Sequence, residues 1–112
     1  QTGPNWLGIK KNVWLEIEPL FCFINHSCNP NTGVKGKVVF VALKDIKKNE
    51  EITFDYSISE DDKFWQMKCY CKQKNCRKTI KSIQFLSKTF NKYLPYIPIY
   101  FKKIYLNIYK IL

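Results

Sequence analysis

The segment Asn25-His26-Ser27-Cys28-Asn29-Pro30-Asn31 constrains this chain most, because it fits neither an ordinary helix nor an ordinary strand. Asparagine tolerates left-handed backbone angles and bonds its own backbone, and proline fixes φ and offers no N–H. The apolar run Leu20-Phe21-Cys22-Phe23-Ile24 leads straight into this segment, which places it at the end of a buried strand. Buried amides and an imidazole need partners, since each unpaired polar group costs about 1–3 kcal/mol. The segment is therefore either a binding site or a structural Asx-type turn.

Three of the five cysteines are clustered at Cys69, Cys71 and Cys76. An odd number of cysteines and the absence of a recognisable signal peptide argue against a disulfide framework. Closely spaced thiols are typical of metal ligation in a reducing compartment, and tetrahedral zinc takes four ligands. We therefore expect a Zn2+ site in an intracellular, cytoplasmic protein, or a nuclear one in a eukaryote.

Three motifs along the chain together resemble those of the SET-domain protein lysine methyltransferases. Asn25–Asn31 resembles the family's NHSCxPN motif, Glu50–Tyr56 its E-[EL]-x-T-F-D-Y motif, and Cys69–Arg77 its post-SET C-x-C-x4-C cluster. Small bacterial proteins of this type also carry stretches similar to Phe85-Leu86 and Lys92–Tyr96. The resemblance implies a mainly β fold: a SET-domain β-clip with a pseudoknot, a post-SET zinc loop and C-terminal helices.

The same resemblance implies a division into three parts. Residues 1–68 correspond to the C-terminal part of a SET domain, residues 69–77 to the post-SET zinc-binding segment and residues 78–112 to a C-terminal helical tail. The family's N-terminal G-x-G turn and its Y-x-G motif have no counterpart here. With Gln1 as first residue, we expect the chain to lack roughly the first third of the domain. We also expect it to bind the methyl donor weakly or not at all by itself.

The function that the resemblance implies is protein lysine N-methylation with S-adenosylmethionine. The substrate would be a lysine-bearing protein or peptide, histone-like ones included. Asn25 and His26 would contact the donor, and Ile80 would cover its adenine as an apolar residue. Without the motif, His26 would be a satisfied core histidine.

The implied catalytic residue is Tyr56, whose counterpart in the family places its hydroxyl where the lysine amine meets the donor. Phe54 and the main-chain carbonyls around Phe23 and Ile24 would line the substrate channel. The amine, whose pKa in water is about 10.4, must be neutral to attack. An apolar channel and the neighbouring sulfonium charge both lower that pKa. The alternative to this catalytic interpretation is that Phe54 and Tyr56 are simply aromatic residues of an edge strand.

The resemblance also implies the fourth metal ligand. In the family it is the cysteine of the NHSC motif, which is Cys28 here, beside Cys69, Cys71 and Cys76. Cys22 is left over, and we expect it to be a small buried hydrophobe.

Hydrophobic periodicity predicts the elements. From Ile80 the apolar residues recur every three or four positions, which predicts a helix that ends at Pro95. A second helical stretch of about 14 residues follows Pro98. It is shorter than the roughly 20 residues that a helix needs to span a bilayer. This last stretch either packs on the domain or lies on a membrane surface. We predict a turn-rich start at 1–9, a turn flanked by Gly33 and Gly36, and strands at 11–17, 20–24, 37–43 and 51–56.

Charge is divided unevenly along the chain. Residues 1–62 hold seven lysines and nine acidic residues, whereas residues 63–112 hold eleven lysines, one arginine and no acidic residue. A one-sided basic half suits a nucleic acid or a membrane surface. We favour biased composition over such a partner, because phosphate-binding proteins usually also use arginine. The rival functions are a non-catalytic, zinc-stabilised, SET-derived interaction module and a basic nucleic-acid or membrane-surface binder.

Overall fold

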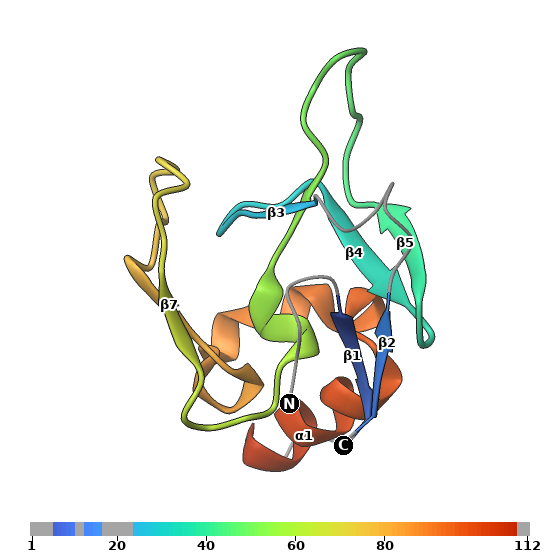
Figure 1. Cartoon of the computed structure of the whole chain (residues 1–112), viewed down its shortest axis with the longest axis vertical. Helices are drawn as coiled ribbons and strands as arrows, with labels where there is room; N and C mark the ends of the chain where they lie inside the picture. The colour runs from blue at the N-terminus through green and yellow to red at the C-terminus, as the bar shows by residue number, and fades with distance from the viewer. Residues whose placement is uncertain (1–5, 11–12, 17–23, 110–112) are drawn as a thin grey trace.

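The computed structural model describes residues 6–10, 13–16 and 24–109. Its strands pair two by two into small sheets, and helical segments gather at the base of the molecule (Figure 1). The pairs are β1 (Trp6–Lys10) with β2 (Val13–Glu16), β3 (Asn25–His26) with β6 (Thr53–Phe54), β4 (Thr32–Lys35) with β5 (Val39–Ala42), and β7 (Gln66–Lys68) with β8 (Thr79–Lys81). The helical segments are the 3-10 helices η1 (Tyr56–Ser59), η2 (Ile83–Phe85) and η3 (Lys88–Tyr96) and the α-helix α1 (Ile99–Tyr109).

The pairing of β3 with β6 joins two distant motifs. These strands run parallel, with Asn25 opposite Thr53 and His26 opposite Phe54. The Ser27 N–H extends the contact by donating to the Phe54 carbonyl at 3.2 Å. The polar segment and the F-D-Y segment are therefore held side by side, although 28 positions separate their paired residues.

Asn31, at the C-terminal end of the polar segment, also binds the segment that contains β6. Its buried amide donates to the Glu51 carbonyl at 2.8 Å and to the Glu50 carboxylate at 3.2 Å. Its side-chain oxygen accepts from the Thr53 N–H at 2.9 Å. The partners that a buried amide requires are thus supplied by the second motif.

The main core lies between β4, β6 and the helical segments. Helix α1 buries Phe101 and Tyr105 in it, and the Tyr105 hydroxyl donates to the carbonyls of Ser87 and Lys88 at 2.8 and 2.9 Å. Gly33 lets β4 approach η3 closely, because a Cβ there would lie 2.7 Å from the Cβ of Tyr96. The predicted second helix is confirmed, and it packs on the domain. No helix in the described ranges has the length and apolarity needed to cross a bilayer.

The prediction of one helix from Ile80 to Pro95 is wrong. Ile80 lies in β8, opposite Met67, and two 3-10 helices follow, with Pro95 inside the second. Ser82 and Ser87 precede these helices in extended conformations, with ψ of 173° and 161°, and so interrupt any continuous helix. Local periodicity cannot reveal a strand whose partner lies on the far side of the cysteine loop.

Several strand boundaries also differ from prediction. The turn-rich start contains strand β1, and Gly33 lies within β4, while Gly36, with φ of 66°, forms the turn. The strand predicted over 51–56 ends at Phe54, because the Asp55 carboxylate caps η1 by accepting from the Ser57 N–H at 3.0 Å. The strands predicted over 11–17 and 37–43 are found, shortened, as β2 and β5. Leu20–Phe23 lies outside the described residues.

Candidate functional site

Four cysteine thiols meet beside strand β3. The sulfur atoms of Cys28, Cys69, Cys71 and Cys76 all lie within 4.8 Å of one another, and all four thiols are free. Those of Cys28 and Cys69 are 3.8 Å apart. A tetrahedral zinc with Zn–S bonds of about 2.3 Å places its sulfurs about 3.8 Å apart. The donor type, number and spacing therefore fit one zinc ion.

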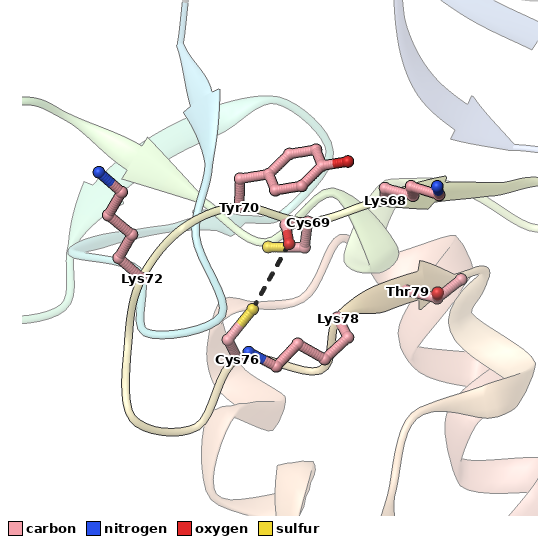
Figure 2. Close-up of a pocket in the computed structure, with 7 residues that line it drawn as sticks. All are labelled: Lys68, Cys69, Tyr70, Lys72, Cys76, Lys78 and Thr79. Carbon is pink, nitrogen blue, oxygen red and sulfur yellow. Dashed lines mark hydrogen bonds between the residues drawn. The ribbon is translucent and has the colours of Figure 1, made fainter.

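The β7–β8 hairpin builds this cluster. Its strands bring Cys69 beside Lys78, where the Cys69 N–H donates to the Lys78 carbonyl at 2.7 Å. The Cys76 thiol turns back toward the Cys69 carbonyl at 3.7 Å (Figure 2). The Asn75 amide donates to the Cys28 carbonyl at 2.9 Å, which ties the loop to the NHSC segment.

The thiols differ in how readily they lose a proton. Burial raises the pKa of Cys28, and it raises the pKa of Cys69 to about 12. Burial also acts to raise the pKa of Cys71, but hydrogen bonds from the Cys28 and Gln73 N–H groups and the neighbouring thiols lower it to about 6. Cys71 is thus a thiolate at neutral pH and the natural first ligand, because metals bind the deprotonated sulfur.

His26 connects the metal ligands to the F-D-Y segment. Its Nδ1 accepts from the Tyr56 N–H at 3.0 Å, so the ring proton of the neutral form is on Nε2, which lies 3.4 Å from the Cys28 sulfur. Burial lowers the pKa of His26, although Asp55 acts in the opposite direction. The ring is therefore neutral and orients Cys28 rather than binding a metal itself.

Asp55 and Arg77 form the strongest ion pair in the described part of the chain. The guanidinium makes two hydrogen bonds to the carboxylate, at 2.7 and 2.9 Å, and the carboxylate is only 1% exposed. The Arg77 N–H also donates to the Cys28 sulfur at 3.3 Å. Burial acts to lower the pKa of Arg77, but the Asp55 carboxylate outweighs it and raises the pKa. The pair links the cysteine loop to the residue before Tyr56.

A cleft of about 400 Å³ opens between β3, β6 and the β7 segment, a size suited to a small-molecule ligand. It combines a carboxylate, an ammonium group, amides and apolar surface. Its lining residues are Asn25, His26, Ser27, Glu51, Thr53, Tyr56, Met67, Lys68, Cys69, Tyr70, Cys71 and Gln73.

Tyr56 lies in this cleft with a fixed hydroxyl. It donates to the Ile24 carbonyl at 2.7 Å, and its ring lies 4.9 Å from the ring of Phe54 and 5.3 Å from that of His26. Burial, together with the Glu51 charge, raises the pKa of Tyr56. The hydroxyl is therefore protonated at neutral pH and points at the main chain that precedes the NHSC motif.

The structure brings most of the predicted site residues together. Asn25, His26 and Tyr56 share the cleft, and Phe54 packs behind Tyr56. Ile80 does not line the cleft: it is fully buried against Cys28 and Cys69. Phe23, like Cys22, lies outside the described residues.

Sequence reasoning missed two features of the site. Glu51 lines the cleft, where its carboxylate accepts from the Asn25 amide at 2.6 Å, although it was counted only as part of a motif. The Asp55–Arg77 pair was also missed. Its one signal in the sequence is an acidic residue between two aromatic residues, because a carboxylate buried in such surroundings needs a partner.

Comparison with known proteins agrees with this geometry. The family model of the SET domain matches residues 4–57, a range that ends before the cysteine loop. The histone-lysine N-methyltransferase SETD1B of Homo sapiens is 42% identical over 65 residues, covering 52% of this chain and 3% of that protein. The H3 lysine-36 specific enzyme of Candida glabrata is 46% identical over 61 residues, covering 48% of this chain and 8% of that protein.

A third relative, the histone-lysine N-methyltransferase set1 of Dictyostelium discoideum, is 38% identical over 65 residues, covering 52% of this chain and 4% of that protein. The chain thus spans only a small part of the length of the curated relatives it matches. The similarity lies in the segment that carries the NHSC and F-D-Y motifs. In this segment, 54 of its 112 residues, the chain is similar to SET-domain proteins.

Proposed function

We propose that this chain carries the active site of an S-adenosylmethionine-dependent protein-lysine N-methyltransferase. The observation that carries the proposal is the hydrogen bond from the Tyr56 hydroxyl to the Ile24 carbonyl inside a cleft formed by both family motifs. This hydrogen bond holds the Tyr56 phenol beside the Ile24 carbonyl. In our proposal the substrate amine and the methyl group of the donor meet at this point.

The cleft suits the methyl donor in chemistry as well as in size. Its Glu51 carboxylate and Lys68 ammonium group complement the amino and carboxyl groups of an amino acid, and Met67 offers apolar surface. Asn25 and His26 would hold the donor, whereas Ile80, buried against Cys28 and Cys69, would support the proposed metal ligands rather than cover the adenine. When bound, S-adenosylmethionine supplies an electrophilic methyl group on a sulfonium.

The residues of this chain would act mainly by positioning. The Tyr56 hydroxyl and the carbonyls near Phe23 and Ile24 orient the substrate amine, and Phe54 shapes the channel behind it. An apolar channel favours the neutral amine, because desolvation lowers a lysine pKa. Alignment of the reacting atoms then supplies most of the acceleration.

We further propose that Cys28, Cys69, Cys71 and Cys76 bind one structural zinc ion, which would fasten residues 69–77 beside the donor site. In this account residues 1–68 belong to the SET domain, with its NHSC segment threaded in a pseudoknot, and residues 78–112 form a tail that begins with strand β8 and continues as helical segments. Four thiolates repel one another in a small volume, and a divalent cation removes that repulsion.

The substrate that we propose is a lysine-bearing protein, with histone-like proteins as the first class to examine. Its support is the printed activity of the relatives, which are histone-lysine methyltransferases. An intracellular location follows from the reduced thiols that the metal site requires. The second candidate function is a non-catalytic zinc-stabilised interaction module, which the closed cysteine cluster alone would also support.

Binding and single-turnover transfer separate the two candidates. The zinc-loaded chain, joined at its N-terminus to a segment that supplies the G-x-G turn and the Y-x-G motif, is titrated with S-adenosylmethionine by calorimetry and then incubated, in excess, with a lysine-bearing peptide. The methyltransferase proposal predicts donor binding and a peptide heavier by one methyl group, detected by mass spectrometry. Intact zinc with neither binding nor transfer would leave only the interaction module.

A further inference from the structure

A second hollow, of about 490 Å³, lies along the cysteine loop and adjoins the cleft that holds Tyr56. The two share Lys68, Cys69 and Tyr70. We call it the basic groove: it is lined by Lys68, Cys69, Tyr70, Lys72, Cys76, Lys78 and Thr79 (Figure 2). Three of these seven residues are lysines and none is acidic, so the groove carries a net positive charge.

Two of the lysines hold unusual backbone conformations. Lys72 has φ of 62° and Lys78 has φ of 67°, both in the left-handed region that favours glycine. A side chain at such a position costs free energy that glycine would not. Strain of this kind, repeated at two positions of one groove, marks the loop as a place where a function is worth testing.

The three ammonium groups of the groove have no partner within the described part of the protein. None of them forms an ion pair, a side-chain hydrogen bond or a cation–π contact there. All nine acidic residues of the chain lie in residues 1–62, so no carboxylate side chain of residues 63–112 neutralises the groove. Four thiolates with one zinc would carry a net charge of about −2, less than the charge of the three lysines. Its charge is available to an external anion.

The spacing of the lysines suits a polyanion with several separate negative charges rather than one small anion. Figure 2 shows Lys68 and Lys72 projecting in opposite directions, with Lys78 below them just before strand β8, so the three do not converge on one point. Tyr70 stands between Lys68 and Lys72 in sequence and is 78% exposed, an unusual state for a large aromatic side chain. Spaced cations with an exposed aromatic ring match the backbone and an unstacked base of a single strand.

We propose that the basic groove binds single-stranded nucleic acid, with Lys68, Lys72 and Lys78 contacting phosphates and Tyr70 stacking on a base. This proposal does not rest on the proposed methylation, but the two sites share Lys68 and Tyr70, so the nucleic acid and the methyl donor would compete for them. Biased composition explains many lysines, but it does not explain lysines at two positions where the backbone favours glycine.

The test compares the parent chain with the double variant Lys72→Gly/Lys78→Gly. Glycine relaxes both backbones, so the variant should melt at a temperature no lower than the parent. Its affinity for a labelled single-stranded oligonucleotide of about 16 nucleotides should fall about tenfold or more, read by fluorescence anisotropy. The slope of log K against log salt should fall by about 0.7 for each lysine removed.

A charge-matched control, Lys88→Gln/Lys103→Gln, removes two exposed lysines from η3 and α1, away from the groove. It should bind the oligonucleotide within about twofold of the parent, since long-range charge is screened by salt. Tyr70→Ala should weaken single-strand binding while Tyr70→Phe preserves it, and a duplex of equal length should bind less tightly than the single strand.

Three results would overturn the proposal. Unchanged oligonucleotide affinity in Lys72→Gly/Lys78→Gly would remove the groove from any binding role. Equal affinity for a poly-glutamate peptide would assign it to acidic proteins instead. Loss of bound zinc from the variant would show that the lysines serve to balance the charge of the four thiolates.

Discussion

Asp55 and Arg77 are joined by two hydrogen bonds, of 2.7 and 2.9 Å, between a carboxylate that is almost fully buried and a guanidinium that stacks on the Phe90 ring. Asp55 immediately precedes Tyr56, and Arg77 immediately follows Cys76. The pair therefore holds the cysteine loop and the proposed catalytic tyrosine in one rigid unit.

Removing the arginine should destabilise this unit strongly. Arg77→Gln leaves the Asp55 carboxylate buried without its cation, so the free energy of unfolding should fall by about 3 kcal/mol. Urea denaturation measures this loss. The double variant Asp55→Asn/Arg77→Gln should recover part of it, because no buried charge is then left unpaired. A change below about 0.5 kcal/mol in Arg77→Gln would mean that water solvates Asp55 adequately without the pair.

The metal proposal predicts one zinc per chain in reductively purified protein. Cys76→Ser removes one thiolate and should lower zinc occupancy, and amide hydrogen exchange should accelerate over the loop from Tyr70 to Lys78, because metal binding orders the loop. Cys22→Ser is the matched control, since Cys22 is the one cysteine of the sequence outside the proposed ligand set. Equal zinc content in Cys76→Ser and Cys22→Ser would contradict the assignment.

Phe54 should control how many methyl groups the amine accepts. Its ring is 93% buried, with the rings of Tyr56 and Phe40 4.9 and 5.5 Å away. In Phe54→Tyr, the added hydroxyl and its water should occupy room that a methylated amine needs. Mass spectrometry should therefore show the first methylation retained and later ones suppressed. An unchanged product distribution would leave Phe54 a packing residue only.

Glu60 gives a pH dependence of stability. Burial raises its pKa, and the charges of Asp61 and Asp62 raise it further, while the Asp62 N–H partly opposes them. A carboxyl whose pKa is higher in the folded state stabilises the fold most below its ordinary pKa of 4.5. That contribution is lost as pH rises through the raised value.

Glu60→Gln removes this titration while keeping an oxygen that can accept from the Asp62 N–H, as Glu60 does at 3.1 Å. Between pH 4.5 and 7, the thermal midpoint of Glu60→Gln should therefore rise relative to that of the parent. Calorimetric melting at several pH values measures the difference. A constant difference across this range would show that Glu60 titrates normally in the folded protein.

The sequence predicted the site better than the elements around it. The order of the motifs predicted that Cys28 would join Cys69, Cys71 and Cys76, and the four sulfurs do gather. Such motifs identify residues whose chemistry requires one arrangement. Periodicity, by contrast, assigned Ile80 to a helix, because its strand partner Met67 lies beyond the loop and no local pattern encodes that pairing.

The Asp55–Arg77 pair marks a different limit. The sequence shows that Asp55 stands between two aromatic residues, where a buried carboxylate needs a partner, but 19 lysine and arginine residues could have supplied it. Only the folded structure identifies Arg77 as the partner, because the cysteine loop brings Arg77 next to Asp55. The positive φ angles of Lys72 and Lys78 could not be predicted from the sequence either, since φ angles become known only from the backbone structure.

Tyr56→Phe tests the central claim most directly. The substitution removes only the hydroxyl that donates to the Ile24 carbonyl, so the fold should lose about 1 kcal/mol or less. In the chain extended to supply the G-x-G turn and the Y-x-G motif, single-turnover methyl transfer to a lysine-bearing peptide should slow by about 10²-fold, with calorimetric affinity for S-adenosylmethionine nearly unchanged, because the interaction acts chiefly in the transition state. Full activity in Tyr56→Phe would contradict the catalytic assignment.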